Sequence, residues 1–333
     1  MFESSKLKKL SMLWKKMPIL KKLASIPLKS MVSKQRKPFD DFRKKYLNLT
    51  EVSYFSEEQL ESNPPIADLY CTGSDQVWNS IWNKGFEKPF YLEFAPEGKP
   101  RIAFAASIGR ESIDDWEIEP RKALSRYSSI SMRETSGLEI VRSLGCTDAH
   151  LVLDPTLMLT RDEWAKIATM PSNISGDYIL VYQLNKNNDF VEYSKKLSER
   201  LGIPLVKISY GLYDVQKSAN TLVAPRVTDF IGLFLNAKYV LTDSFHATAY
   251  SLNFNKPFIS VAPSRFSTRI VSILDLVHEP NRLLQSYFDL DLMQKPIDFE
   301  NVNAILNSRR HDSLMFLKHS LAYSEQTSET NEE

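Results

Sequence analysis

The sequence has few of the residues on which several common kinds of site depend. Cys71 and Cys146 are its two cysteines and have no paired spacing, which excludes a disulfide framework or a structural zinc site and favours a reducing compartment. No stretch approaches the roughly eighteen apolar residues of a membrane-spanning helix, and the N-terminus lacks the apolar core of a secretion signal. We therefore expect a soluble, cytoplasmic protein.

Glycine is also scarce, at ten residues in 333. There is no GxGxxG, no Walker loop and no GxSxG elbow, so dinucleotide, P-loop and hydrolase functions lack their local signatures. Any phosphate site would rely on side chains and a helix end. His150, His278, His311 and His319 have no metal-ligand spacing, and we expect neither a metal nor a cofactor.

Charge is unevenly distributed along the chain. Residues 1–37 contain ten lysines and Arg36 against Glu3 alone, a net charge of +10 in a protein whose overall charge is +1. Leucines, Trp14 and Met17 recur there at three- and four-residue spacing, and Pro18 and Pro27 interrupt the pattern. This basic amphipathic segment predicts either peripheral contact with an anionic membrane on its inner face, or an arm that is solvated or docked on the protein itself.

From about residue 66, short apolar runs alternate with amphipathic stretches, a pattern typical of parallel sheets with crossover helices. The predicted strands are Asp68–Thr72, Ile102–Ser107, Ile130–Met132, Leu151–Leu153, Tyr178–Tyr182, Pro204–Ile208, Tyr239–Thr242 and Phe258–Val261. The predicted helices are Trp116–Arg126, Ser136–Leu144, Glu163–Ala168, Phe190–Leu201, Asp229–Leu235, Thr268–Leu276 and Val302–Ala322.

These elements predict two Rossmann-like α/β domains facing across a cleft. The basic segment covers residues 1–45, the N-terminal domain 46–170 on the acceptor side, the C-terminal domain 171–322 on the donor side, and a disordered acidic tail 323–333. Open α/β sheets bind ligands at the carboxyl ends of their strands, so the functional residues should lie in the loops that face the cleft.

Two such loops contain candidates for acid–base chemistry. Asp75 follows a predicted strand and lies near Trp78, an arrangement suited to gripping sugar hydroxyls; alternatively it caps a helix whose core-facing stripe contains Trp78 and Trp82. His246 lies in the first turn of a helix that begins after Thr242, where free amides and the helix dipole favour an anion. The alternative is a structural imidazole bonded to a backbone carbonyl.

Arginines follow two further strands. Arg133 could clamp a phosphate or carboxylate, or pair with Glu134 or another acid. Arg265 and Arg269 follow the strand at Phe258–Val261 and could equally be surface charge.

Four segments, taken together and in order, resemble the polysaccharide pyruvyl transferase family over about residues 66–320. They are Gly73–Asn79, Ser131–Glu134 with Gly137 and Leu144-Gly145, Asp154–Leu159, and Thr242–Ser251 with Asn255–Ile259. The stretch Ser267–Ile270 is similar to the family's arginine-bearing turn.

The resemblance implies a GT-B-like fold and transfer of a pyruvyl group from phosphoenolpyruvate to sugar hydroxyls, which forms a pyruvate ketal on a surface polysaccharide or its lipid-linked precursor. It implies His246 and Asp75 as catalytic residues. The donor-binding residues would be Arg133, Ser244, Phe245, Arg265 and Arg269. The acceptor-binding residues would be Gln76 and Trp78. No nucleic-acid partner is expected, because basic residues and aromatics are not interleaved beyond Trp14.

One departure from the family concerns the N-terminal domain. Members begin with a strand, a loop and a helix, whereas this chain begins in a basic segment, so the first βα unit is expected to be missing. Two other functions therefore stay open: a nucleotide-sugar glycosyltransferase of the same architecture, and a catalytically silent relative that binds sugars or partners.

Overall fold

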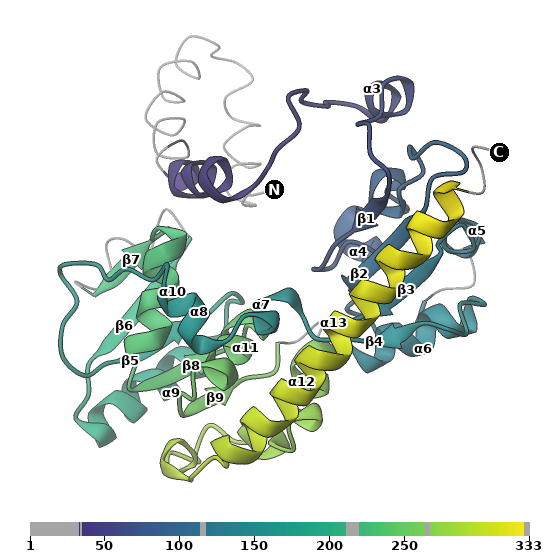
Figure 1. The fold of residues 1–333 in the computed structure, drawn as a ribbon. Coiled ribbons are helices and arrows are strands. Elements are labelled where there is room, and N and C mark those ends of the chain that lie inside the picture. The colour runs from purple at the N-terminus through teal and green to yellow at the C-terminus, as the bar shows by residue number, and fades with distance from the viewer. Residues whose placement is uncertain (1–32, 34, 114–117, 211–219, 264–266, 330–333) are drawn as a thin grey trace, which may run out of the picture.

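The computed structural model describes residues 33, 35–113, 118–210, 220–263 and 267–329. Two parallel β-sheets lie in two separate lobes, connected in sequence by the segment between Leu151 and Ile179 (Figure 1). All eight predicted strands are present, and each end lies within two residues of its expected position. The predicted fold class, two Rossmann-like α/β domains, is confirmed.

The N-terminal sheet has four strands in the order β1-β2-β3-β4, all parallel. Its strands are β1 (Tyr70–Thr72), β2 (Arg101–Ala106), β3 (Ser129–Met132) and β4 (His150–Leu151). The helices of this lobe are α3 (Glu57–Ser62), α4 (Ser80–Asn83), η1 (Lys88–Tyr91), α5 (Ile118–Leu124) and α6 (Thr135–Ser143). Among the described residues β1 pairs with β2 alone, so it forms an edge of the sheet.

The C-terminal sheet has five strands in the order β7-β6-β5-β8-β9. Its strands are β5 (Ile179–Tyr182), β6 (Leu205–Ser209), β7 (Thr221–Val223), β8 (Tyr239–Thr242) and β9 (Phe258–Ser260). Helices α9 (Asn188–Leu201), α10 (Val227–Asn236), α11 (Phe245–Asn253) and α12 (Thr268–Leu276) separate or follow them, with short turns η3 (Pro280–Arg282) and η4 (Leu292–Gln294). Strand β7 was not predicted; it lies at the edge of the sheet, and its three residues are only partly buried. The strand order reverses between β5 and β8, which is where such sheets bind ligands.

The chain crosses to the C-terminal lobe earlier than the predicted boundary at residue 170. Helices α7 (Pro155–Met158) and α8 (Arg161–Ala165) pack on α11 and α10, and the buried Leu153 and Leu157 belong to the apolar core of the C-terminal sheet. The turn-rich sequence after residue 170 is therefore a surface connection within that lobe.

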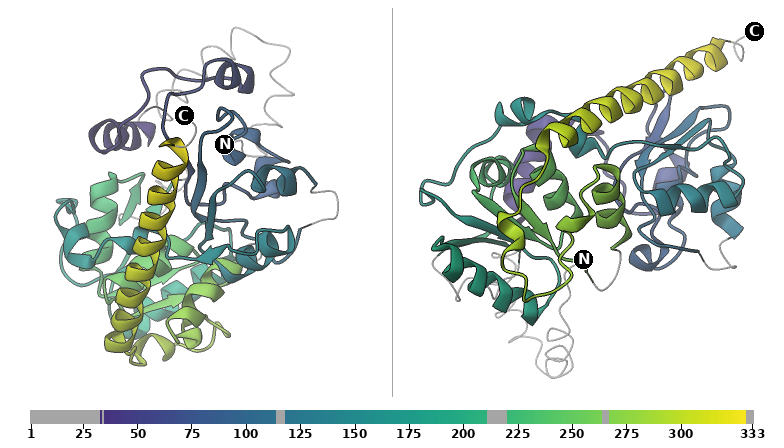
Figure 2. Two further views of the ribbon diagram at one scale, coloured as in Figure 1. Left: turned by 45° about the vertical axis from the view of Figure 1, so that its right-hand side comes forward. Right: turned by 90° about the horizontal axis from the view of Figure 1, so that it is seen from below.

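Helix α13 (Phe299–Glu329) begins in the C-terminal lobe and ends over the N-terminal one (Figure 2). The Ser313 hydroxyl accepts a bond from the Leu153 amide at 2.9 Å, and the ring of Phe316 stacks at 6.5 Å on Phe104 of the N-terminal sheet. The helix thus ties the two lobes together. A disordered tail was expected from residue 323, but the helix continues to Glu329. The polar tail can add further turns because the helix before it is already anchored by packing.

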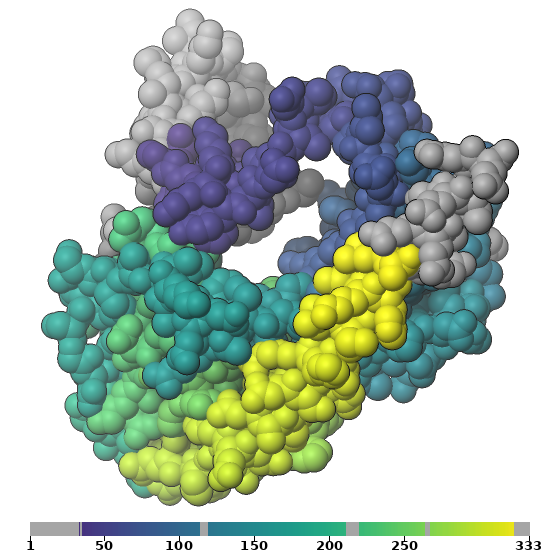
Figure 3. Space-filling view, viewed as in Figure 1, coloured from purple at the N-terminus to yellow at the C-terminus, as the bar shows by residue number. Residues whose placement is uncertain are grey.

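The described part of the basic N-terminal segment is a helix over residues 35–46. Its Phe39 ring lies 5.9 Å from that of Tyr210, so this helix rests on the C-terminal lobe, and the chain then passes over to the N-terminal lobe (Figure 3). The predicted amphipathic stripe between residues 7 and 20 lies outside the described residues. No helix in the described ranges has the length and apolarity needed to cross a membrane.

Candidate functional site

The loops that follow β1, β3 and β8, together with the start of α12, meet where the two lobes face each other. Thr135, at the first turn of α6, bonds through its amide to the hydroxyl of Ser272 on α12 at 3.2 Å, which brings the two lobes into direct contact. Since every strand is parallel, each sheet presents its carboxyl-end loops at this junction. The predicted residues Asp75, Arg133, His246 and Arg269 are brought together here.

Arg133 forms the centre of this junction. Its side chain is 0% exposed and donates to Asp154 Oδ2 at 2.6 Å, to Asp75 Oδ1 at 2.9 Å and to Ser74 Oγ at 3.1 Å. The Glu134 carboxylate lies 3.8 Å from its Nε. The guanidinium is thus occupied by the protein's own acids, which is the alternative left open by the sequence, and a clamp on a ligand falls to other residues.

Two buried acids at this centre had no predicted role. Asp154 caps α7 by accepting bonds from the amide and hydroxyl of Thr156; burial opposes its charge, but Arg133 and His246 together with Thr156 lower its pKa to about 2. Glu134 accepts three bonds on one oxygen, from the Ser107 hydroxyl and the amides of residues 108 and 109, while burial raises its pKa. The Asp154-Pro155 pair is a sequence signal for the start of a helix. No sequence signal indicates that Asp154 pairs with Arg133.

Asp75 faces the open side of the junction. Its side chain is 65% exposed and its backbone has a φ of 74°, a left-handed conformation that turns the chain sharply after β1. Desolvation opposes its charge, but Arg133, His246 and Arg269 hold the pKa of this carboxyl below its ordinary value. Its Oδ1 is held by Arg133, and its Oδ2 accepts no hydrogen bond from the described residues. Asp75 is therefore a fixed, ionised group with one free oxygen.

The start of α11 presents backbone amides to the junction. Ser244 is the N-cap residue, yet its side chain makes no capping bond, so the first amides of the helix have no intrahelical acceptor. The neighbouring Asp243 fixes this turn by accepting from the amides of Leu184 and Asn185 after β5, at 2.7 and 2.8 Å. These donors lie at the point where the strand order reverses, as expected for ligand binding.

His246 lies in the first turn of α11 and is partly exposed, and no hydrogen bond joins its imidazole to the described residues. Burial lowers the pKa of His246; the carboxylates of Asp154 and Asp75 oppose this effect, and Arg133 and Arg269 add to it. The imidazole is therefore neutral near pH 7 in the free protein. An arriving anion would favour its protonated form.

Two guanidinium groups lie against the ring of Phe245. Arg133 lies over it at 4.8 Å and Arg269 at 5.7 Å, and the ring itself is 4% exposed. Phe245 thus packs against cations and has little surface open to a ligand, and its donor-binding role stays a prediction. Arg269 lies 3.9 Å from Asp75 Oδ1, and its buried Nε has no hydrogen-bond partner among the described residues. Arg265 lies outside the described residues.

The two predicted acceptor residues, Gln76 and Trp78, lie in different surroundings. Trp78 is 3% exposed, donates through its indole to the Phe90 carbonyl at 3.0 Å and stacks on Tyr91, so it belongs to the core. Gln76 remains at the junction, between Asn79 on one side and Arg269 and Trp82 on the other. Trp82 is 62% exposed. The alternative that Asp75 caps a helix with both indoles on its core-facing stripe is wrong, because the N-cap of α4 is Asn79 and Trp78 lies in the turn before that helix.

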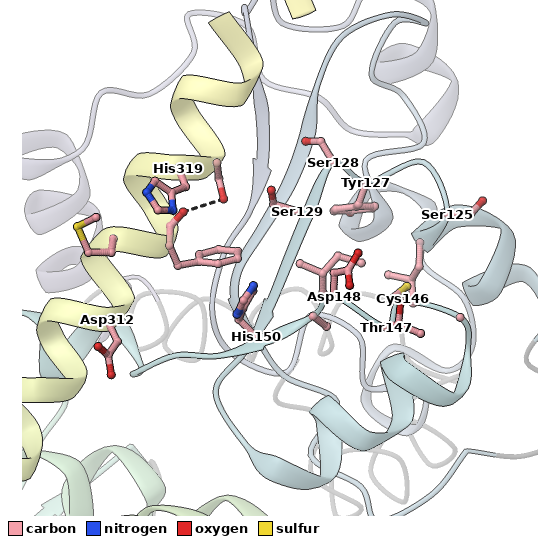
Figure 4. A pocket seen from close by; sticks show the side chains of 17 residues that line it. Ser125, Tyr127, Ser128, Ser129, Cys146, Thr147, Asp148, His150, Asp312 and His319 are labelled. Atoms are coloured by element: carbon pink, nitrogen blue, oxygen red, sulfur yellow. Dashed lines mark hydrogen bonds between the residues drawn. The ribbon is translucent and has the colours of Figure 1, made fainter. Parts of the chain in front are cut away.

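A separate hollow lies at the opposite ends of β3 and β4. It has a volume of about 750 Å³, and Figure 4 shows His150 and His319 on its two sides, the latter on α13. None of its lining side chains is a lysine or arginine, so it does not suit a phosphorylated acid. Among the described side chains, no group of three His, Cys, Asp or Glu is placed to hold a metal ion.

Comparison with solved structures shows distant likenesses. The UDP-GlcNAc 2-epimerase of Methanocaldococcus jannaschii, in complex with UDP-GlcNAc and UDP, is 16% identical, covers 76% of this chain and 72% of its own, and has a TM-score of 0.48. The wall teichoic acid polymerase TagF (H444N, with CDPG) is 14% identical, covers 68% of this chain and 69% of its own, and has a TM-score of 0.41. Scores below 0.5 carry no conclusion about function.

Sequence comparison gives a stronger result. No curated protein sequence matches the chain. The family model described as "Polysaccharide pyruvyl transferase" matches residues 8–265, which is more than half of the chain and includes both sides of the junction around Arg133. The chain belongs to the polysaccharide pyruvyl transferase family.

Proposed function

We propose that the chain transfers a pyruvyl group from phosphoenolpyruvate to two hydroxyls of a sugar, forming a pyruvate ketal on a surface polysaccharide or its lipid-linked precursor. The observation that supports this most directly is the placement of His246 and Arg269, from the C-terminal lobe, beside the ionised Asp75 of the N-terminal lobe. One side of the junction offers cationic and amide donors, and the other a carboxylate.

The donor side fits a small molecule that carries both a phosphate and a carboxylate. The open amides of α11, the Ser244 hydroxyl, the imidazole and Arg269 can together bind both anionic groups. Arg133 contributes indirectly, because it holds Asp75 and Asp154 in place while remaining out of contact with solvent. We assign it a positioning role.

The proposed reaction adds the acceptor across the donor double bond. His246 becomes protonated when phosphoenolpyruvate binds and delivers this proton to the methylene carbon of the donor. The first sugar hydroxyl attacks C2 of the donor. Asp75 orients that hydroxyl and its proton leaves to water. The C2–phosphate bond then breaks with release of inorganic phosphate, and a neighbouring hydroxyl attacks C2, loses its proton and closes the ketal. Acid–base assistance of this kind accelerates a reaction about a hundred- to ten-thousand-fold.

Calorimetry with the purified protein tests this proposal. Phosphoenolpyruvate should bind, and UDP-sugars should bind more weakly or not at all, because the donors at the start of α11 and Arg269 suit a small molecule with two anionic groups. Phosphate release from phosphoenolpyruvate should require a sugar acceptor. Binding of UDP-sugars without binding of phosphoenolpyruvate would favour a glycosyltransferase instead, and binding without any phosphate release would favour a silent relative.

A further inference from the structure

A second hollow, of about 360 Å³, opens on the N-terminal side of the junction, directly beside Asp75. The described residues that line it are Asp75, Gln76, Val77, Trp82, Asn83 and Phe90. Because it shares the Asp75 carboxylate with the site above, a molecule bound in it would lie next to the proposed donor. It is separate from the anion-binding start of α11, which none of its lining residues belongs to.

The wall of this hollow is an indole held in an exposed position. Trp82 lies on α4, whose N-cap Asn79 is 0% exposed and accepts from the amides of Ile81 and Trp82 at 3.0 and 3.2 Å. The helix ends at Lys84 in a left-handed conformation, φ 62°. The cap and the turn fix the backbone of Trp82, while 62% of its surface stays open to solvent.

The edge of the indole is fixed as well. With the Gln76 carbonyl turned toward it, that oxygen accepts from Trp82 Nε1 at 3.2 Å and from Arg269 Nη2 at 3.1 Å. On the opposite side, Phe90 is anchored through its carbonyl, which accepts from Thr72 and Trp78. The aromatic face is therefore pre-positioned, so that little conformational entropy is lost when a ligand stacks on it.

The chemistry of the lining selects a neutral, hydroxyl-bearing ring. None of the lining side chains is cationic, and the one charged group among them is the Asp75 carboxylate, so the lining offers an anionic ligand no charged partner. A pyranose has an apolar C–H face that can pack on the indole, and hydroxyls that can donate to the free Oδ2 of Asp75. An exposed tryptophan beside a carboxylate offers both contacts at once.

We infer that this hollow is a pyranose subsite, in which Trp82 stacks on the acceptor sugar and directs its hydroxyl pair toward Asp75. The inference rests on the proposed function for the identity of the ligand as the acceptor, but the sugar contact itself follows from the geometry of the hollow. It assigns to Trp82 the role that the sequence had given to Trp78.

The test measures binding of defined pyranosides to the full-length protein. Methyl α- and β-pyranosides of glucose, galactose and mannose are titrated against the protein and followed by saturation-transfer NMR, with the wild type, Trp82→Ala and Trp82→Phe. At least one pyranoside should bind, Trp82→Ala should weaken its binding about tenfold, and Trp82→Phe should recover part of the loss.

Ile81→Ala is the matched control, because Ile81 lies on the same helix, is 52% exposed and is outside the hollow. It should bind like the wild type. The subsite is refuted if none of the six pyranosides binds, or if Trp82→Ala binds as tightly as the wild type. A protein that binds a pyranoside through Trp82 but never releases phosphate from phosphoenolpyruvate would retain the subsite and overturn the proposed function instead.

Discussion

Replacing Arg133 by methionine should destabilise the protein by about 3–5 kcal/mol, because the change leaves buried carboxylates without their cation. The guanidinium is 0% exposed and lies 2.6 Å from Asp154, 2.9 Å from Asp75 and 3.8 Å from Glu134. Methionine has a similar length and keeps the contact with the Phe245 ring, so the loss reports charge and hydrogen bonds more than volume.

Part of this expected loss of stability can be calculated from the pKa of Asp154. Its pKa of about 2 in the folded protein, against an ordinary 3.8, corresponds to about 2 kcal/mol of stabilisation. Because the folded pKa is the lower one, this stabilisation is fully present above pH 3.8 and is lost as the pH falls toward 2. The difference between wild type and Arg133→Met should therefore be large at neutral pH and shrink in acid.

Urea denaturation followed by circular dichroism, at neutral pH and at about pH 3, measures both effects. Arg200→Met is the matched control, since Arg200 is 48% exposed and pairs with Asp291, which is 65% exposed. Such a surface pair contributes about 1 kcal/mol or less. An Arg133→Met variant that loses no more stability than Arg200→Met, or whose loss does not depend on pH, would refute the ionic centre described here.

Three further predictions concern function. His246→Ala should lower phosphate release from phosphoenolpyruvate about a hundredfold or more with an unchanged circular dichroism spectrum, and undiminished turnover would remove the imidazole from the reaction. Binding of phosphoenolpyruvate should take up a proton and weaken by up to about tenfold per pH unit above the lowered pKa of free His246, as calorimetry in buffers of different ionisation enthalpy can measure; binding without proton uptake would contradict this coupling. Deleting residues 1–34 should reduce co-sedimentation with phosphatidylserine vesicles, because the deletion removes most of the basic segment; equal sedimentation would favour an arm without lipid contact.

The convergence of the candidate residues could be predicted from the sequence. Asp75, Arg133 and His246 each follow a strand, and parallel strands bring such positions to one edge of each sheet. The number of strands was harder to predict, because β7 is an edge strand whose residues are only partly buried. The lobe boundary was missed because α7 and α8 are short helices whose apolar faces pack on α11 and α10, a contact that no local signal contains.

The orientation of individual side chains could not be predicted. Helical spacing placed Trp78 and Trp82 on one stripe, but α4 has only four residues and follows a left-handed turn at Asp75, which turns the second indole outward. Arg133 looked available for a ligand because its partner Asp154 is contributed by the segment after β4, 21 residues farther along the chain. Such partners become visible only once the fold brings distant segments together.

The most direct test of the proposed function is mass spectrometry of the host's surface glycan and its lipid-linked precursors, from cells with and without this protein. A pyruvate ketal should be present in cells that contain the wild-type protein and absent from cells that lack it, and His246→Ala should fail to restore it. A ketal that persists in the absence of the protein, or that never appears in its presence, would contradict the account.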